Sequence, residues 1–404
     1  MTTQTGFLPY GRHVIDEDDI AAVVDALRSD YLTTGPRVGI FEQDLAQATG
    51  ARHAIACSNG TAALHLAARV LNLGPGTVSV VPAVTFLATA NAVRLNGGEV
   101  VFADVDPDTG LMRPQDLEEA LSRCPDKRAD AVFNVHLAGQ TGDVVGIYSV
   151  ARHNNLRIVE DACHALGTRY CVADGETHVV GSCRFSDLTC FSFHPVKTIA
   201  MGEGGAVTTD DPTLAKLIIR DRSHGMSREP IEFVQTQEAF ESSNQVNPWY
   251  YEMDAPGLNY RIPDVLCALG VSQLKKLDGF AARRRALVAL YDAELLALAP
   301  HIQLLGRTTN VTPAWHLYVA LIDFEALGRT RNQVMRELAD EGIGTQVHYL
   351  PVYRQPYYRE LNPFVTLAGA DEYYRRTLSL PLFPSMTDDD PLRVVSALRR
   401  ALGL

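Results

Sequence analysis

Short apolar runs rich in β-branched residues alternate with longer amphipathic segments along the first half of the chain. The runs predict buried strands, because they are brief and bounded by turn residues; they lie at residues 53–57, 77–81, 100–105, 131–137, 157–162, 188–193 and 204–209. Helical spacing predicts helices at residues 61–73, 85–96 and 114–124. Because most runs lack strict apolar–polar alternation, we expect strands covered on both faces and a mostly parallel sheet in a large α/β domain.

The pattern changes from residue 263 onward. Residues 263–298 contain no proline after Pro263, and their apolar positions fall near helical spacing until Pro300 ends the segment. One long or kinked helix is therefore predicted to connect a large domain, residues 1–275, to a smaller C-terminal α+β domain, residues 276–404. No internal repeat or low-complexity linker separates the two.

The composition of the chain argues against some classes of binding partner. The chain carries 36 basic and 48 acidic residues, a formal charge of −12, which argues against broad binding to nucleic acid or to an anionic membrane. No apolar stretch is long enough to span a bilayer, and the first residues do not resemble a signal peptide. The seven cysteines are an odd and sparse set, which favours reduced thiols and a cytoplasmic enzyme.

Two motifs place polar groups where a predicted strand ends. In CSNGTAALH, residues 57–65, a strand turns through Gly60 and Thr61 into a helix, and a helix start of this kind can seat a phosphate. An ordinary helix cap is the alternative interpretation. In IVEDACHALG, residues 158–167, Asp161 follows a buried strand. It is either a cap or the partner of a cationic ring or a metal.

Two further motifs add an amine and an aromatic ring. Lys197 lies between an apolar strand and a glycine-rich turn; a lysine near buried strands suits Schiff-base chemistry, although a surface loop lysine would look the same. Phe86 in TFLATANAV either belongs to the core or offers a flat platform to an aromatic ligand.

The four motifs together are more specific than each alone. Pyridoxal 5′-phosphate needs a lysine for its aldehyde, an acid for its ring nitrogen, donors for its phosphate and a ring contact. Here the chain resembles the DegT-type sugar aminotransferases, a branch of the fold-type-I pyridoxal-phosphate enzymes. The resemblance covers nearly the whole sequence and includes LTTGP (32–36), SNGTAALHLA (58–67), TFLATANAV (85–93), EDACHALG (160–167), FSFHPVKTIAMGEGGAV (191–207), GLNYRIPD (257–264) and HYLPVY (348–353).

The resemblance implies a role for each matching residue. Lys197 would form the Schiff base, Asp161 would face the pyridine nitrogen, and His164 would lie near the cofactor's oxygen. The implied phosphate contacts and stacking ring are Gly60, Thr61, Ser192 and Phe86. Substrate contacts are implied for Thr34, His348 and Tyr349.

The same resemblance implies a homodimer with shared active sites. Asn259 and Arg261, in GLNYR, match a loop that reaches the neighbouring subunit's cofactor. Two departures from the family pattern are Cys163, where alanine is more usual, and Ala200-Met201, where many relatives carry two threonines. The second departure puts local packing and substrate fit in question, and the cofactor less so.

Within the family, one subgroup is most similar. SFHPVK with GEGG, WYYEM (249–253), ALGVSQLKKLD (268–278) and SLPLFP (379–384) resemble the UDP-4-amino-4,6-dideoxy-N-acetyl-β-L-altrosamine transaminases of pseudaminic acid biosynthesis. This resemblance implies ping-pong transfer of an amino group from L-glutamate to the nucleotide sugar UDP-4-keto-6-deoxy-L-AltNAc. The alternatives are another nucleotide-sugar 3- or 4-aminotransferase, or a non-catalytic sensor or scaffold that binds the cofactor.

Metal and nucleotide sites have weaker support. Cysteine and histidine gather within 28 residues, but the cysteines are separated by seven, eleven and six intervening residues rather than two to four; the group is Cys163, His164, Cys171, Cys183 and Cys190. We therefore interpret them as inert thiols and predict no metal. Neither G-x-G-x-x-G nor G-x₄-G-K-[ST] occurs. The arginine run at 283–285 is interpreted as a solvated or interface face.

Overall fold

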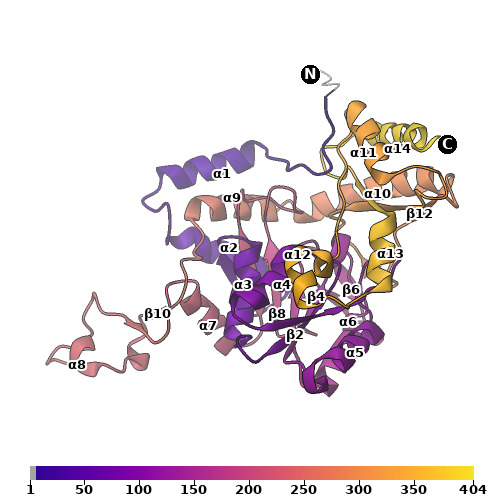
Figure 1. Cartoon of the computed structure of the whole chain (residues 1–404). Coiled ribbons are helices and arrows are strands. Elements are labelled where there is room, and N and C mark those ends of the chain that lie inside the picture. The colour runs from indigo at the N-terminus through magenta and orange to yellow at the C-terminus, as the bar shows by residue number, and fades with distance from the viewer. Residues whose placement is uncertain (1–5) are drawn as a thin grey trace.

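The predicted strands form one seven-stranded sheet in the computed structural model, which describes residues 6–404 (Figure 1). Its order is β1-β9-β8-β5-β4-β2-β3, and only β9 runs antiparallel to its neighbours. The strands are β1 His53–Cys57, β2 Val78–Pro82, β3 Glu99–Ala103, β4 Ala131–Val135, β5 Arg157–Asp161, β8 Leu188–Ser192 and β9 Gly205–Thr209. The prediction of a mostly parallel sheet is confirmed, with strand ends displaced by one or two residues.

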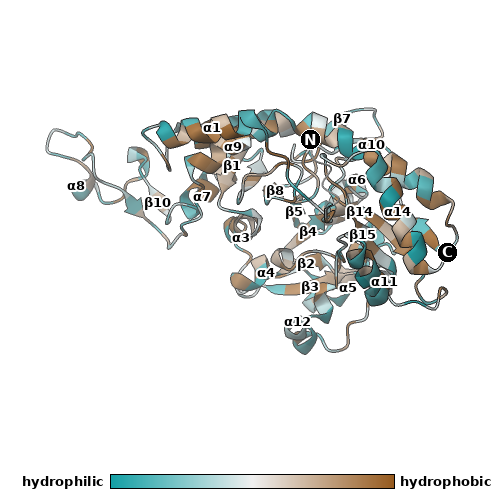
Figure 2. Ribbon diagram, turned by 90° about the horizontal axis from the view of Figure 1, so that it is seen from above, coloured by the Kyte–Doolittle hydropathy of each residue, from teal (hydrophilic) through white to brown (hydrophobic). Residues whose placement is uncertain are grey.

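Helices cover the sheet, as the pattern between the strands predicts. They are α3 Gly60–Val70, α4 Leu87–Leu95, α5 Pro114–Arg123, α6 Val144–His153 and α7 Pro212–Asp221. Nine of the eleven residues of α3 are buried; a helix that is apolar all round belongs inside the molecule. Outer helices such as α1 (Glu17–Arg28) and α14 (Asp389–Leu402) instead carry hydrophobic and hydrophilic residues along the same element (Figure 2). The position of α3 is therefore fixed by packing on every side.

Two N-terminal helices were not predicted. Helix α1, Glu17–Arg28, begins with a capping box between Asp16 and Asp19. Helix α2, Pro36–Thr49, has no cap of its own, and the buried Asp264 accepts hydrogen bonds from the N–H groups of Gly35 and Arg37 at its start. The LTTGP motif is thus tied to the GLNYRIPD motif more than 200 residues away.

The segment predicted as one long or kinked helix is two helices, α9 Asp264–Leu274 and α10 Leu277–Leu296. A second sheet follows, with antiparallel strands in the order β12-β14-β15. Its strands are β12 Ile302–Leu304, β14 Tyr318–Ile322 and β15 Thr377–Leu380. The helices of this part of the chain are α11 Arg331–Asp340, α12 Pro356–Leu361, α13 Ala368–Arg376 and α14 Asp389–Leu402. One hydrophobic cluster includes residues of both sheets, and the division at residues 275 and 276 stays a prediction.

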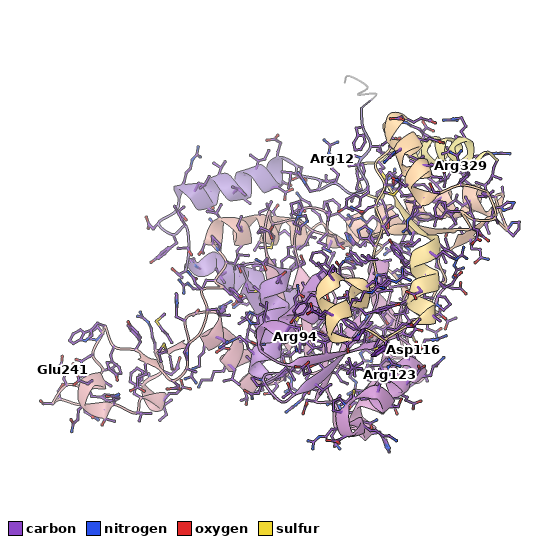
Figure 3. All side chains as sticks on the ribbon, in the orientation of Figure 1. Arg12, Arg94, Asp116, Arg123, Glu241 and Arg329 are labelled. Carbon is purple, nitrogen blue, oxygen red and sulfur yellow. The ribbon has the colours of Figure 1, made fainter. Side chains whose placement is uncertain are left out.

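Two smaller features were also missed. A three-stranded sheet joins β6 Arg169–Cys171, β7 Thr177–Val179 and β13 Val311–Thr312. Residues 226–253, which we call the arm, leave the body between β10 Met226–Ser227 and β11 Glu252–Met253 and include α8 Thr236–Ala239 (Figure 1). Glu241 lies near the arm's far end (Figure 3).

Candidate active site

A cavity of about 790 Å³ opens where β5 and β8 end and α3 begins. This is the edge of the sheet at which open α/β folds bind ligands. Nine of the residues singled out in the sequence line it, and these are Gly60, Thr61, Phe86, Asp161, His164, Ser192, Lys197, His348 and Tyr349. The structure therefore brings together residues that are up to 289 positions apart in the chain.

The start of α3 forms a cradle at one end of the cavity. The N–H groups of Gly60 and Thr61 are the first two of the helix and have no partner inside it. The side chain of Asn59 accepts the N–H of Ala62 at 2.8 Å and holds the turn. A Cβ atom on Gly60 would lie 2.7 Å from that of Ser192, so only glycine lets the Ser192 hydroxyl approach. Two N–H groups, a helix dipole and a hydroxyl are a suitable seat for a phosphate.

Asp161 lines the cavity where β5 ends. It is the last residue of β5 and is only 5% exposed. Its Oδ2 atom accepts the hydroxyl of Thr89 at 2.6 Å, and its Oδ1 atom accepts the N–H of Cys163 at 3.2 Å. Thr89, in the first turn of α4, shares a hydrogen bond of 2.7 Å with Thr85, which lies just before the helix. These hydrogen bonds fix the orientation of the Asp161 side chain, which lines the cavity as a partner for a cationic ring nitrogen would.

Lys197 lies in the loop that follows β8. Its backbone N–H donates to the carbonyl of His194 at 2.8 Å. Burial lowers the pKa of the Lys197 amine, while the nearby Cys163 and Asp161 act in the opposite direction. The net lowering enlarges the unprotonated fraction of the amine, which is the form that attacks an aldehyde.

Neutral histidines form the wall nearest the second sheet. The N–H of Ala138 donates to His164 Nδ1 at 3.4 Å, which leaves Nε2 as the protonated nitrogen facing the Tyr349 hydroxyl at 3.2 Å. The ring of His316 lies 4.3 Å from that of His164, centroid to centroid. His348 Nδ1 is 2.8 Å from the Ser379 hydroxyl. Burial is the main cause that lowers the pKa of all three histidines.

The mouth of the cavity is aromatic and polar. Phe86 is 56% exposed, so it is a platform rather than a core residue, and its ring lies 6.0 Å from that of Tyr349. Sequence reasoning missed several other lining residues, among them Tyr10, His194, Glu203, Tyr260, His316 and Gln346. Among the described residues that line the cavity, Lys197 is the one lysine or arginine.

Three predicted site residues lie outside the cavity of their own chain. Tyr260 lines it and hydrogen-bonds His65 Nδ1 at 3.0 Å. Asn259 and Arg261 flank Tyr260, and Asn259 pairs with Ser223 in an isolated bridge. Neither Asn259 nor Arg261 lines this cavity. Thr34 is exposed in the loop before α2 and does not line the cavity.

The profile of the DegT/DnrJ/EryC1/StrS aminotransferase family matches residues 13–399. The chain belongs to this family. Among its relatives, the spore coat polysaccharide biosynthesis protein SpsC of Bacillus subtilis is 38% identical over 97% of this chain and 96% of its own.

Solved structures of the aminotransferase family confirm the predicted fold class. Helicobacter pylori PseC, an aminotransferase involved in the biosynthesis of pseudoaminic acid, superposes with a TM-score of 0.86. It is 26% identical, over 98% of this chain and 99% of its own. The PLP form of Spr1654 from Streptococcus pneumoniae has a TM-score of 0.84 and 27% identity, with the same coverage. The protein is thus an aminotransferase, as predicted.

Several interpretations of this aminotransferase sequence change with the structure. The arginine run at 283–285 is not a solvated face, since Arg284 is only 1% exposed and Arg283 pairs with Asp388. Ala200 and Met201 are buried behind the lysine loop and do not line the cavity, so their departure from the family pattern concerns packing.

The cysteines follow the inert-thiol interpretation only in part. Cys163 lines the cavity. Cys163 and Cys171 are partly buried, and the other five cysteines are buried. Within residues 6–404, no group of three or more histidine, cysteine or acidic side chains is placed to hold a metal ion. Over the same residues, no helix has both the length and the apolar composition to cross a bilayer.

Proposed function

We propose that this aminotransferase transfers an amino group from L-glutamate to C4 of a 4-keto-6-deoxy nucleotide sugar, with UDP-4-keto-6-deoxy-L-AltNAc as the first candidate. The observation that carries the proposal is one cavity that joins Lys197, Asp161 and the start of α3. Membership of the family confirms the predicted cofactor, pyridoxal 5′-phosphate. The individual roles of the residues below are part of the proposal.

The cavity has the volume and the donor set for this cofactor. At about 790 Å³ it lies within the usual range for small-molecule sites. The N–H groups of Gly60 and Thr61 and the Ser192 hydroxyl would bind the phosphate. The exposed face of Phe86 would contact the ring, and Asp161 would receive the ring N–H. Lys197 would bind the aldehyde covalently.

The chain's own residues then divide the chemical work. When bound, the cofactor supplies an electron sink for the bonding pair that a departing proton leaves behind. The Lys197 amine, once released, would remove the proton from the amine-bearing carbon of the donor and would deliver it to the carbon that had carried the cofactor's aldehyde, two bonds away. The Asp161 carboxylate stabilises positive charge at the ring nitrogen throughout. His164, neutral and held by Ala138 and Tyr349, offers a fixed N–H to a cofactor or substrate oxygen.

The names of two relatives support a sugar nucleotide as acceptor. The relatives SpsC and PseC act, by their names, in the biosynthesis of a coat polysaccharide and of pseudoaminic acid. The diphosphate of such a substrate needs cations beyond Lys197, the one lysine or arginine among the described residues that line the cavity. Asn259 and Arg261 of a second subunit would meet that need in a homodimer. Thr34, His348 and Tyr349 would contact the sugar. The cytoplasmic location stays a prediction.

The proposal is tested first by trapping. Borohydride reduction of the holoenzyme should fix the cofactor to Lys197, located by peptide mass spectrometry. Lys197→Ala should take no label and lose turnover by at least about 10²-fold, the usual contribution of positioned acid–base catalysis. A protein that binds no added cofactor would contradict the proposal.

Substrates separate the alternatives. L-glutamate should convert the holoenzyme to its amino form, whereas a sensor or scaffold need not respond. A screen of keto nucleotide sugars with L-glutamate should then give an amine at C4 of the UDP-linked candidate. An amine at C3, or on another sugar only, would favour a different member of the family.

A further inference from the structure

Arg284 is an isolated cation inside the protein. It lies in α10, is 1% exposed, and is among the largest fully buried side chains. Its Nη2 atom donates to the backbone carbonyl of Lys197 at 3.3 Å. Across residues 6–404, its Nε and Nη1 atoms have no hydrogen-bond partner and no acidic side chain pairs with it. The pKa of the guanidinium is lowered to about 10 by burial.

Such a residue does not serve stability. A buried charge without a counter-ion opposes folding, because desolvation is not offset by an ion pair. The neighbouring arginines are ordinary by comparison. Arg283 pairs with Asp388, and Arg285 is half-buried and donates to the carbonyl of Pro313, also at 3.3 Å. Arg284 and Arg285 thus make the same kind of bond, but only the first is made to the lysine loop.

Three hydrogen bonds to backbone groups hold the loop around Lys197, and two of them come from side chains on α9 and α10. The N–H of Lys197 donates to His194, and the N–H of Ala200 donates to the Gln273 side chain on α9 at 3.2 Å. Arg284 supplies the bond to the carbonyl of Lys197 itself. The backbone of Lys197 is therefore bound at both its N–H and its C=O, while the side chain lines the cavity.

We propose that Arg284 is a positioning residue for Lys197, and that its buried guanidinium fixes the lysine backbone so that the amine stays directed at the cofactor's aldehyde. The inference rests on the proposed function, since it assumes that Lys197 is the reacting amine. A charged donor is needed because charge-assisted hydrogen bonds are roughly twice as strong as neutral ones. The residue acts through Lys197 and not on the substrate.

The test is Arg284→Met, with Arg285→Met as the matched control and Arg284→Lys as the conservative variant. Four properties are measured on each holoenzyme, namely the melting temperature, borohydride labelling at Lys197, the visible circular-dichroism band of the bound cofactor, and kcat with KM for L-glutamate. We expect Arg284→Met to melt at or above the wild-type temperature, because an apolar side chain replaces an unpaired charge. Its kcat should fall at least tenfold and its dichroic band should weaken, with KM changed less than threefold.

Every result of these measurements either supports or overturns the role proposed for Arg284. Arg284→Lys should recover part of the kcat and of the dichroic band, and Arg285→Met should resemble the wild type. An Arg284→Met protein that fails to fold or melts lower would show a merely structural role, and one with wild-type kcat and dichroism would remove any role; either overturns the inference. If wild-type Lys197 itself takes no label, it is the proposed function that fails.

Discussion

His348 shows how burial at the site couples to pH. Burial lowers the pKa of its imidazole to about 3, with Lys197 nearby as a second cause. In the unfolded chain a histidine titrates near 6.5. Between these two values the unfolded state binds the extra proton, so this contribution to stability is present above pH 6.5 and is lost as the pH falls.

The loss of unfolding free energy at low pH can be measured. Lowering the pH from 7 to 5.5 should remove about 1.3 kcal/mol of unfolding free energy through His348 alone. His348→Gln should therefore flatten the dependence of urea unfolding on pH over this range. His13, which is exposed in the N-terminal segment, is the control, and His13→Gln should leave the slope unchanged. Equal slopes for His348→Gln and the wild type would show that the imidazole is not held neutral in the fold.

At the scale of single residues, the sequence identifies some residues of the site and not others. Lys197 and Asp161 are recognisable because each is a charged residue beside a buried strand within a motif. His316 touches His164 from 152 positions away, and no local pattern joins the two. Thr89 had a usable signal, since its spacing of four from Thr85 would place both hydroxyls on one face of the helix predicted at residues 85–96. The burial of Arg284 had none, because arginine runs are usually exposed.

At the scale of elements, the junction of α3 with β8 is decided by one glycine. Gly60→Ala places a Cβ atom 2.7 Å from that of Ser192, so the helix start must shift away from the hydroxyl. We expect the Kd for pyridoxal 5′-phosphate to rise at least tenfold, measured by the absorbance of the bound cofactor. Gly39→Ala in α2 is the control, since nothing lies within 4 Å of its added Cβ. Comparable affinity in both variants would show that the cradle does not bind the phosphate.

Element prediction succeeded where one physical signal dominates. Buried parallel strands are short apolar runs, and all seven strands of the main sheet were found this way. Helix α2 was missed because its N-terminal cap comes from Asp264, far along the chain. Strands β6, β7 and β13 have two or three residues each, too few for any period to show. The break between α9 and α10 falls at Lys275 and Lys276, which by themselves favour a helix.

At the scale of the whole molecule, the cavity of one chain is incomplete for an anionic substrate. Lys197 is its one lysine or arginine within the part of the chain that the structure describes. Asn259 and Arg261 do not line it, and they lie in the segment between the arm and α9. In the proposed two-fold dimer, with this loop at the interface, the side chain of Arg261 would serve the cavity of the partner subunit.

Complementation tests this sharing. Lys197→Ala and Arg261→Ala should each be inactive alone, since every site lacks one group. When the two are co-expressed, half of the dimers combine one subunit of each, and one of the two sites in such a dimer takes its lysine and its arginine from unaltered chains. About a quarter of the wild-type activity should return. The pair Lys197→Ala with Asp161→Ala is the control, because both residues line the same cavity and mixing repairs neither site. Recovery in both mixtures would point to an artefact of co-expression, and recovery in neither would place Arg261 in its own subunit's site or in none, so that the charge of the diphosphate would have to be met by other groups.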